Sequence, residues 1–291
     1  MAKFTNLHIL NLQIVRHMCL IGLMGLILTS CNWEAYTFRK KLALAAPVLN
    51  AACPMNFPYG SLQRIYLEDD TLCTLVKVGT NVPDITVFKH HESELMQAMF
   101  IFLAEDSTYS QITDLLKDMS KYDVWLRMRV DNTPNKGGSM QSVRLYAPPS
   151  MLDSVFSGRL SERERALAKV RVQILLTQLQ LPITINSGMT MTDISYADGE
   201  VLMAYTVKED DQVNLGREAF RTTAQLFIRQ RIWNELIRSK NAATQEVMKQ
   251  YYLSGSRLRY TCTGETSGGQ VQVLLTQGDL RMLLSHYGLH L

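Results

Sequence analysis

Alternating apolar and polar positions predict β-hairpins in two places along the chain. In the stretch SLQRIYLEDDTLCTLVKV, Ile65 and Leu67 alternate with polar neighbours, Asp69-Asp70 forms a turn, and a second apolar strand runs to Val78. In the stretch MTMTDISYADGEVLMAYTV, Asp198-Gly199 holds the same place between two strands. An Asp-Gly pair between alternating strands is a strong hairpin signal, because the turn requires positive φ.

The two stretches align with a shift near 128 residues and one gap. The matching pairs are Pro54 and Pro182, Gly60 and Gly188, Ile65 and Ile194, Asp69 and Asp198, and Val78 and Val207. Each copy then continues with helical patterns and with a second strand pair around a Gly-Gly dipeptide, at 137–138 and 268–269. An internal duplication is therefore predicted.

Hydrophobic periodicity places the remaining elements in the same order in both copies. The predicted helices are 40–50, 93–104, 109–119 and 150–156 in the first copy, and 161–180, 217–239, 244–252 and 277–284 in the second. The predicted later strands are 124–130, 143–146, 257–262 and 271–275. Pro47 should shorten or kink the first helix. In the helix 217–239, one apolar stripe is formed by Phe220, Ala224, Ile228, Ile232 and Leu236, widened by Phe227 and Trp233.

These patterns predict an α+β fold with two tandem copies of an antiparallel four-stranded sheet, each with helices packed on one face. The predicted organisation is a signal peptide over 1–30, a tether and leading helix over 31–52, a first repeat over 53–158 and a second repeat over 159–291.

The N-terminal segment is typical of export. Met18 to Ser30 reads MCLIGLMGLILTS, apolar and uncharged, behind Arg16 and His17. A helix needs about 20 residues to cross a bilayer, so this segment is too short to span one. A short apolar core behind a basic residue and before small residues indicates a secretory signal. The apolar stretch Leu7 to Val15 leaves the start at Met1 or Met18 open.

The segment ends in Leu28-Thr29-Ser30-Cys31, which resembles the lipobox of bacterial lipoproteins. The resemblance covers only about the first 31 residues. It implies that Cys31 takes a diacylglyceryl group, that the signal is cut before it, and that its freed amine can also be acylated. Two or three acyl chains hold a protein firmly at a membrane.

The resemblance also bears on location. Asn32, by the enterobacterial sorting pattern, permits the outer membrane, and a periplasm-facing body is expected; inner and outer membrane both remain open. Trp33, Tyr36 and Phe38 either rest at the headgroup level or belong to a plain tether.

Composition excludes broad electrostatic binding. Of 30 basic residues only Lys3 and Arg16 lie in the first 30 positions, so the rest carries 28 basic against 27 acidic residues. A nearly neutral body lacks the positive field of nucleic-acid binding proteins. No nucleic-acid partner is expected; the expected partners are membrane lipid, through Cys31, and an envelope protein.

Three cysteines, Cys53, Cys73 and Cys262, remain after removal of Cys19 and lipidation of Cys31. Their spacing matches no metal or redox motif. We expect buried free thiols, with one disulfide as the alternative.

The sequence shows no phosphate loop, G-x-S-x-G, H-E-x-x-H or C-x-x-C motif. His286 and His290 have the spacing of metal ligands on a helix, but their place at the chain end favours a frayed tail. No catalytic, cofactor-binding or metal-binding residue is therefore predicted, and Cys31 is the one predicted site.

Two classes of function follow. The first is a non-enzymatic binding or accessory module of the cell envelope, using an open sheet face or the groove between repeats. An assembly or protective role is indistinguishable from it. The alternative is a hydrolase or other enzyme with a site at the repeat interface, for which His90, Asp84 and Glu92 are candidates.

Overall fold

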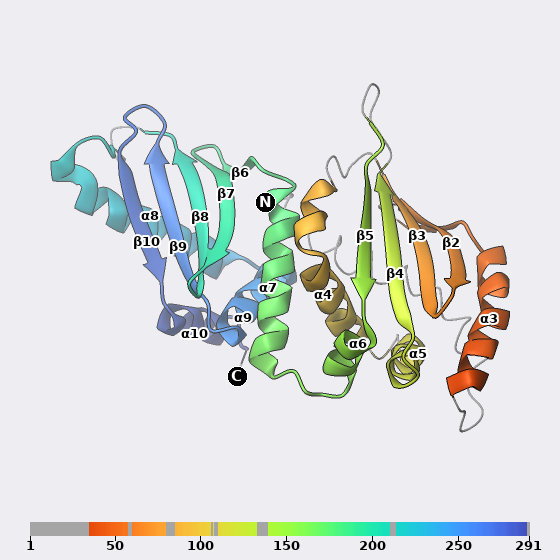
Figure 1. Ribbon diagram of the computed structural model, residues 1–291. Helices are drawn as coiled ribbons and strands as arrows, with labels where there is room; N and C mark the ends of the chain where they lie inside the picture. The colour runs from red at the N-terminus through yellow and green to blue at the C-terminus, as the bar shows by residue number, and fades with distance from the viewer. Residues whose placement is uncertain are drawn as a thin grey trace. The chain divides into compact units, whose positions relative to one another are not determined.

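The protein consists of two compact units, divided between Ser161 and Glu162 (Figure 1). The computed structural model describes residues 35–57, 60–79, 85–105, 107, 110–132, 139–209 and 214–289. Each unit is described by itself below.

The described part of the first unit begins with a helix and continues with a five-stranded sheet and further helices. Its elements are α3 (Ala35–Ala51), β1 (Met55–Phe57), β2 (Gly60–Glu68), β3 (Thr71–Val78), the 3₁₀ helix η2 (Thr86–His90), α4 (Glu92–Glu105), α5 (Ser110–Lys121), β4 (Trp125–Asn132), β5 (Ser142–Ala147) and α6 (Pro149–Phe156).

The second unit repeats this order without a described counterpart of η2. Its elements are α7 (Glu162–Gln178), β6 (Ile183–Asn186), β7 (Met189–Ala197), β8 (Glu200–Val207), α8 (Glu218–Arg238), α9 (Ala242–Leu253), β9 (Arg257–Gly264), β10 (Gln270–Leu275) and α10 (Gln277–His286).

The predicted α+β class and the two sheet copies are confirmed, but the sheets differ from the prediction in two respects. Each has five strands, in the orders β1-β2-β3-β4-β5 and β10-β9-β8-β7-β6, because a short edge strand precedes the first hairpin. Each is mixed rather than antiparallel, because β3 pairs with β4, and β8 with β9, in parallel. The two helices between the hairpins return the chain to the starting end of the sheet, as a parallel connection requires.

Matching details in the two sheets confirm the duplication. Both first hairpins carry a bulge, between Leu62 and Arg64 and between Met191 and Asp193. Gly60 pairs with Val78 as Met189 pairs with Val207, so Gly60 corresponds to Met189 and the predicted match to Gly188 is wrong by one residue.

A polar side chain at the end of the leading helix reaches the same strand position in both units. The Asn50 carboxamide oxygen accepts from the backbone N–H of Ile65, at 3.0 Å. In the second unit Gln178 donates its amide to the carbonyl of Ile194, at 2.7 Å. This contact fixes each leading helix against its sheet.

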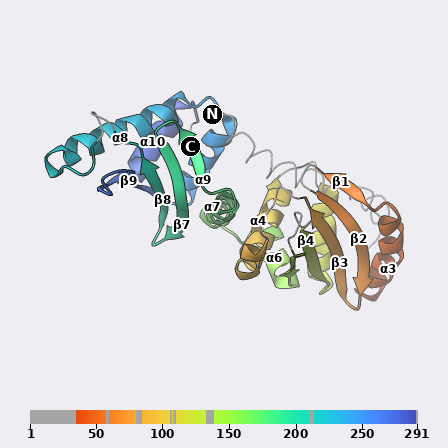
Figure 2. The ribbon, with the colours of Figure 1, turned by 90° about the horizontal axis from the view of Figure 1, so that it is seen from above.

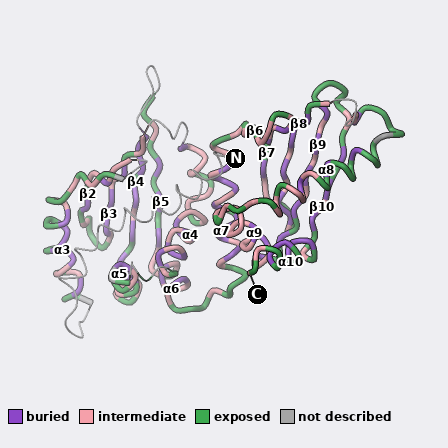
Figure 3. Tube along the Cα trace, turned by 180° about the vertical axis from the view of Figure 1, so that it is seen from behind, coloured by how far each residue is buried: buried purple, intermediate pink, exposed green. Residues whose placement is uncertain are grey.

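Each core lies between one face of the sheet and the helices. Figure 2 shows α8 and α10 on the same side of the second sheet, and Figure 3 shows buried positions along the strands and the inward sides of the helices. In α8 the predicted stripe is buried at Ala224, Ile228 and Ile232, and Leu236 and Trp233 are partly buried against the same core. The Phe220 side chain lies outside the described ones. Phe227 is 42% exposed, however, so it does not widen that stripe.

The leading helix α3 belongs to the first unit and contacts β2. It continues through Pro47, so the predicted shortening is wrong. Phe38 is 3% exposed and stacks on Tyr122 with ring centroids 5.0 Å apart, which excludes the proposed headgroup position for this residue. Burial of one whole side of the helix accounts for its persistence past the proline.

The C-terminal segment is ordered to Leu289, contrary to the predicted frayed tail. Gly288 has φ +74°, and Leu289 donates its N–H to the carbonyl of Leu284 at 3.0 Å, closing α10 with a glycine cap. The Tyr287 hydroxyl donates to the carbonyl of Leu236 at 2.7 Å. His290 lies outside the described residues. Among the described residues, no helix is long and apolar enough to span a membrane.

Candidate interaction surface

The first unit presents one sheet face that is turned away from its hydrophobic core. Successive side chains of a strand point to opposite faces, and paired residues share a face. Leu126, Met128 and Val130 of β4 are buried and point toward the helices. Strand pairing then defines the opposite side, the open face of the first sheet, which carries Ser61, Arg64, Tyr66, Glu68, Thr71, Cys73, Leu75, Lys77, Trp125, Arg127, Arg129, Asp131, Ser142, Arg144 and Tyr146.

Aromatic rings are exposed on this face. Tyr66, Trp125 and Tyr146 expose 38%, 42% and 39% of their surface. They come from β2, β4 and β5, and the strand register places all three on the same face of the sheet. The Arg64 guanidinium lies 5.6 Å from the centre of the Tyr66 ring, within cation–π range.

The open face of the first sheet is basic. Its charged residues are Arg64, Lys77, Arg127, Arg129 and Arg144 against Glu68 and Asp131. Arg127 pairs with Glu68. Arg129 donates from Nε to Oδ1 of Asp131 at 2.8 Å, and this hydrogen bond raises the pKa of Arg129. The excess of basic over acidic side chains gives the face a positive field.

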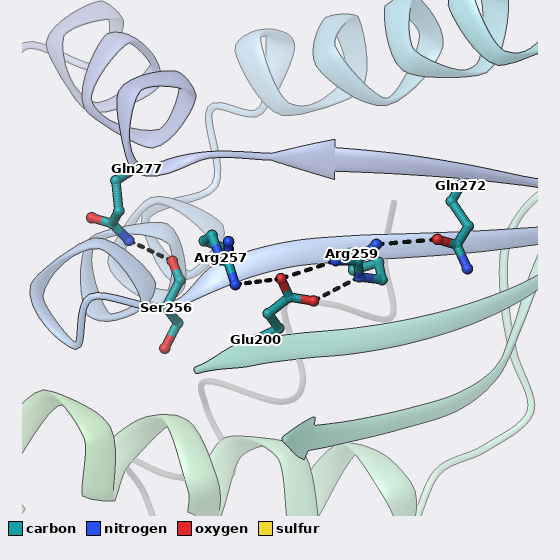
Figure 4. A network of polar contacts seen from close by, with 6 residues as sticks. All are labelled: Glu200, Ser256, Arg257, Arg259, Gln272 and Gln277. Atoms are coloured by element: carbon teal, nitrogen blue, oxygen red, sulfur yellow. Dashed lines mark hydrogen bonds and ion pairs between the residues drawn. The ribbon is translucent and has the colours of Figure 1, made fainter. Parts of the chain in front are cut away.

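The corresponding face of the second sheet carries a polar network (Figure 4). Arg259 on β9 donates from Nε and Nη2 to the two carboxylate oxygens of Glu200, at 2.6 and 3.0 Å. Arg257 also pairs with Glu200, at 2.8 Å, and Arg259 donates to the Gln272 side chain at 3.1 Å. The hydrogen bond from Arg259 lowers the pKa of Glu200.

The two faces have diverged at equivalent positions. Arg127 and Arg259 occupy the same register position, and both bind a carboxylate beside the first hairpin turn. The aromatic positions have changed. Counting along the paired strands, the three replacements are Ser195 for Tyr66, Arg257 for Trp125 and Leu274 for Tyr146. The arginine–aromatic combination is therefore particular to the first unit.

Glu209 organises the end of the second sheet. Its carboxylate accepts from the backbone N–H of Leu215, Thr266 and Ser267, at 2.8, 3.1 and 2.7 Å, and from the Ser267 hydroxyl at 2.6 Å. Desolvation opposes its ionisation, but these hydrogen bonds outweigh it and lower the pKa of Glu209 to about 2. Gly264 permits the approach, since a Cβ there would lie 2.5 Å from Glu209 Cδ. This contact joins two loops and suits a structural role.

The structure does not bring the three candidate catalytic residues together among the residues that it describes. His90 ends η2 and is exposed, Glu92 begins α4, and Asp84 lies outside the described residues. The neighbouring His91 pairs with Glu94 at 2.7 Å. An open pocket of about 460 Å³ lies between α5 and α6, and neither His90 nor Glu92 lines it. Within the described ranges, no group of three or more His, Cys, Asp or Glu could hold a metal ion.

The cysteines of the body are free thiols, as predicted. Cys73 and Cys262 are buried and Cys53 is partly buried, with no disulfide among them. Burial raises the pKa of Cys262 to about 12, which makes it unreactive. The predicted lipidation residue Cys31 lies outside the described residues, and so do Asn32 and Trp33.

The comparisons with known proteins give no family. No family model matches the chain, and no curated protein does. A crystal structure of a Pseudomonas aeruginosa protein that is predicted to be secreted aligns over 43% of this chain and 100% of its own, at 12% identity and a TM-score of 0.30. A likeness this weak carries no argument about fold or function.

The sequence already contained a signal for the open face. In VWLRMRV the apolar Leu126, Met128 and Val130 alternate with Trp125, Arg127 and Arg129. The outward side of a solvent-facing strand usually carries small polar or charged side chains. Here it carries an aromatic residue and two arginines, which is typical of a contact surface. The pairing with β2 and β5, which adds Tyr66 and Tyr146, could not be read from that stretch alone.

Proposed function

We propose that this protein is a membrane-anchored lipoprotein of the bacterial cell envelope that acts as a non-enzymatic binding or accessory module. Acylated Cys31 is the anchor, and a periplasm-facing body binds a protein partner through the open face of the first sheet. The observation that carries the binding role is the gathering of Tyr66, Trp125 and Tyr146 with four arginines on that face.

The chemistry of this face favours a protein partner with an acidic surface. Tyrosine, tryptophan and arginine are the residues enriched at the energetic centres of protein interfaces. The rings of tyrosine and tryptophan supply apolar contact area at low entropic cost. Guanidinium groups bind carboxylates in a fixed, bidentate geometry. The basic excess of the face complements carboxylates, and such complementarity mainly speeds association and selects the partner.

Charge reversal tests the proposed binding face. The full-length protein is purified from solubilised membranes as the wild type, as Arg144→Glu on the face, and as Arg281→Glu on the exposed side of α10 as a matched control. We expect an acidic envelope protein to co-purify with the wild type and with Arg281→Glu, but several-fold less with Arg144→Glu. Equal recovery of the partner with all three proteins would contradict binding through the open face.

A second arm checks that the contact is electrostatic. Exposed charge pairs are screened by salt, with a Debye length of about 10 Å at 0.1 M and about 3 Å at 1 M. Recovery with the wild type should therefore fall as the salt concentration rises. Recovery that does not change with salt would contradict an acidic partner on this face.

A further inference from the structure

Helix α3 is apolar on its outward side as well as on its buried side. The buried side carries Phe38, Leu42, Ala45, Ala46 and Leu49. The opposite side, the outer face of α3, consists of the exposed residues Tyr36, Thr37, Lys40, Ala43, Leu44, Pro47, Val48 and Ala51. Only Thr37 and Lys40 among them are polar or charged.

The exposure of this face is large for apolar side chains. Tyr36, Leu44 and Val48 expose 68%, 74% and 57% of their surface. They recur at intervals of four or eight residues, together with Lys40, so they follow one side of the helix. A contiguous exposed apolar patch on a protein surface indicates a contact with a partner or a membrane.

The position of α3 in the chain indicates that this contact is with a membrane rather than with a protein partner. Only three residues separate Cys31 from Ala35, the first residue of α3. A chain spans at most about 3.6 Å per residue, so the first turn of α3 lies within about 15 to 20 Å of an acylated Cys31. A lipid anchor at Cys31 therefore holds the start of α3 beside the headgroup layer.

We propose that the outer face of α3 rests in the interfacial layer of the membrane, an inference that depends on the lipid anchor proposed above. Leu44 and Val48 enter the boundary between headgroups and acyl chains, as the apolar side of an interfacial helix does. Tyr36 occupies the headgroup level, where tyrosine is enriched.

Lys40 completes the match to a lipid surface. Its ammonium group lies 4.5 Å from the centre of the Tyr36 ring, on the same exposed side of the helix. A lysine at this position can place its ammonium group among anionic headgroups while its methylene chain covers apolar surface. The helix thus adds an orienting contact to the acyl chains.

Photo-cross-linking tests the inference on the full-length acylated protein. Leu44→p-benzoylphenylalanine is reconstituted in vesicles of phosphatidylethanolamine and phosphatidylglycerol and irradiated, and its peptides are weighed by mass spectrometry. The matched control places the same residue at Met282 on α10, which is 58% exposed. The mass of the N-terminal peptide is recorded in the same samples.

We expect phospholipid adducts at position 44 at several-fold the level at position 282, with Cys31 acylated. A covalent dimer through position 44 would instead assign the face to a second copy of the chain and overturn the inference. Equal adducts at both positions, with Cys31 acylated, would overturn it while leaving the anchor intact. An unmodified Cys31 would overturn the anchor and the inference together.

Discussion

Arg259 binds Glu200 through two parallel hydrogen bonds, of 2.6 and 3.0 Å, and this pair joins two neighbouring strands of the second sheet. The equivalent Arg127 in the first sheet binds Glu68 on the other side of the hairpin turn. The duplicated arginine has therefore kept its role as a carboxylate partner while the carboxylate has moved.

This pair of arginines gives a matched test of burial. The Glu200 side chain is 8% exposed, whereas that of Glu68 is 54% exposed. A shielded carboxylate that loses a donor suffers a larger penalty than one that water can solvate. We expect Arg259→Met to lower the midpoint of urea unfolding more than Arg127→Met. Equal shifts would contradict a stabilising role particular to the Glu200 pair.

Glu209 makes stability depend on acid pH. Its folded pKa of about 2 lies below its usual value of 4.5, so between these values the unfolded chain binds more protons. The stability it contributes is fully present above pH 4.5 and is lost as the pH falls toward 2. We expect the melting temperature of Glu209→Gln to fall less steeply over this window than that of the wild type. Glu265→Gln, exposed and on the β9–β10 turn that Glu209 binds, serves as the control and should keep the wild-type slope.

Two leucines of α3 test whether this helix is part of the first unit. Leu42 is 0% exposed and Leu44 is 74% exposed. Leu42→Ala should lower the free energy of unfolding by about 2 to 5 kcal/mol, as buried leucines do. Leu44→Ala should change it by about 0.5 kcal/mol or less in detergent. Similar small effects in denaturant titrations of both variants would show that α3 is a loose tether.

The free thiols should differ in reactivity. Burial raises the pKa of Cys262 to about 12 and leaves its sulfur shielded, whereas Cys53 is only partly buried. We expect N-ethylmaleimide to modify Cys53 first and to reach Cys262 only after unfolding, as measured by peptide mass spectrometry. If Cys262 of the native protein were modified as fast as Cys53, the core of the second unit would be accessible to the reagent, contrary to this prediction.

A composition rich in Ala and Leu predicted α7, which buries alternate positions from Ala166 to Ile174. Periodicity predicted those helices that bury one side and repeat their apolar positions near every fourth residue. The stripe Ala224, Ile228 and Ile232 is an example. Strand alternation predicted β4 and β9 for the same reason. It could not reveal that these strands run parallel to β3 and β8, since the alternation of faces is identical in both directions. The edge strand β1 spans three residues, too few to show a period.

The candidate surface was only partly predictable. The open sheet face was expected as a contact surface, and its β4 residues can be read from the alternation around Leu126. Tyr66, Trp125 and Tyr146 come from three strands separated by long stretches of chain, and only the strand register brings them together. The exposed side of α3 was also hidden, because the sequence pattern does not say which apolar side is buried.

The most direct test of the central claim is the mass of the mature N-terminus, measured with membrane fractionation for the wild type and for Cys31→Ala. The account predicts a chain that begins at an acylated Cys31 and sediments with membranes, and a variant that is unmodified and no longer held there by acyl chains. An uncleaved or unmodified N-terminus in the wild type would contradict the lipoprotein assignment.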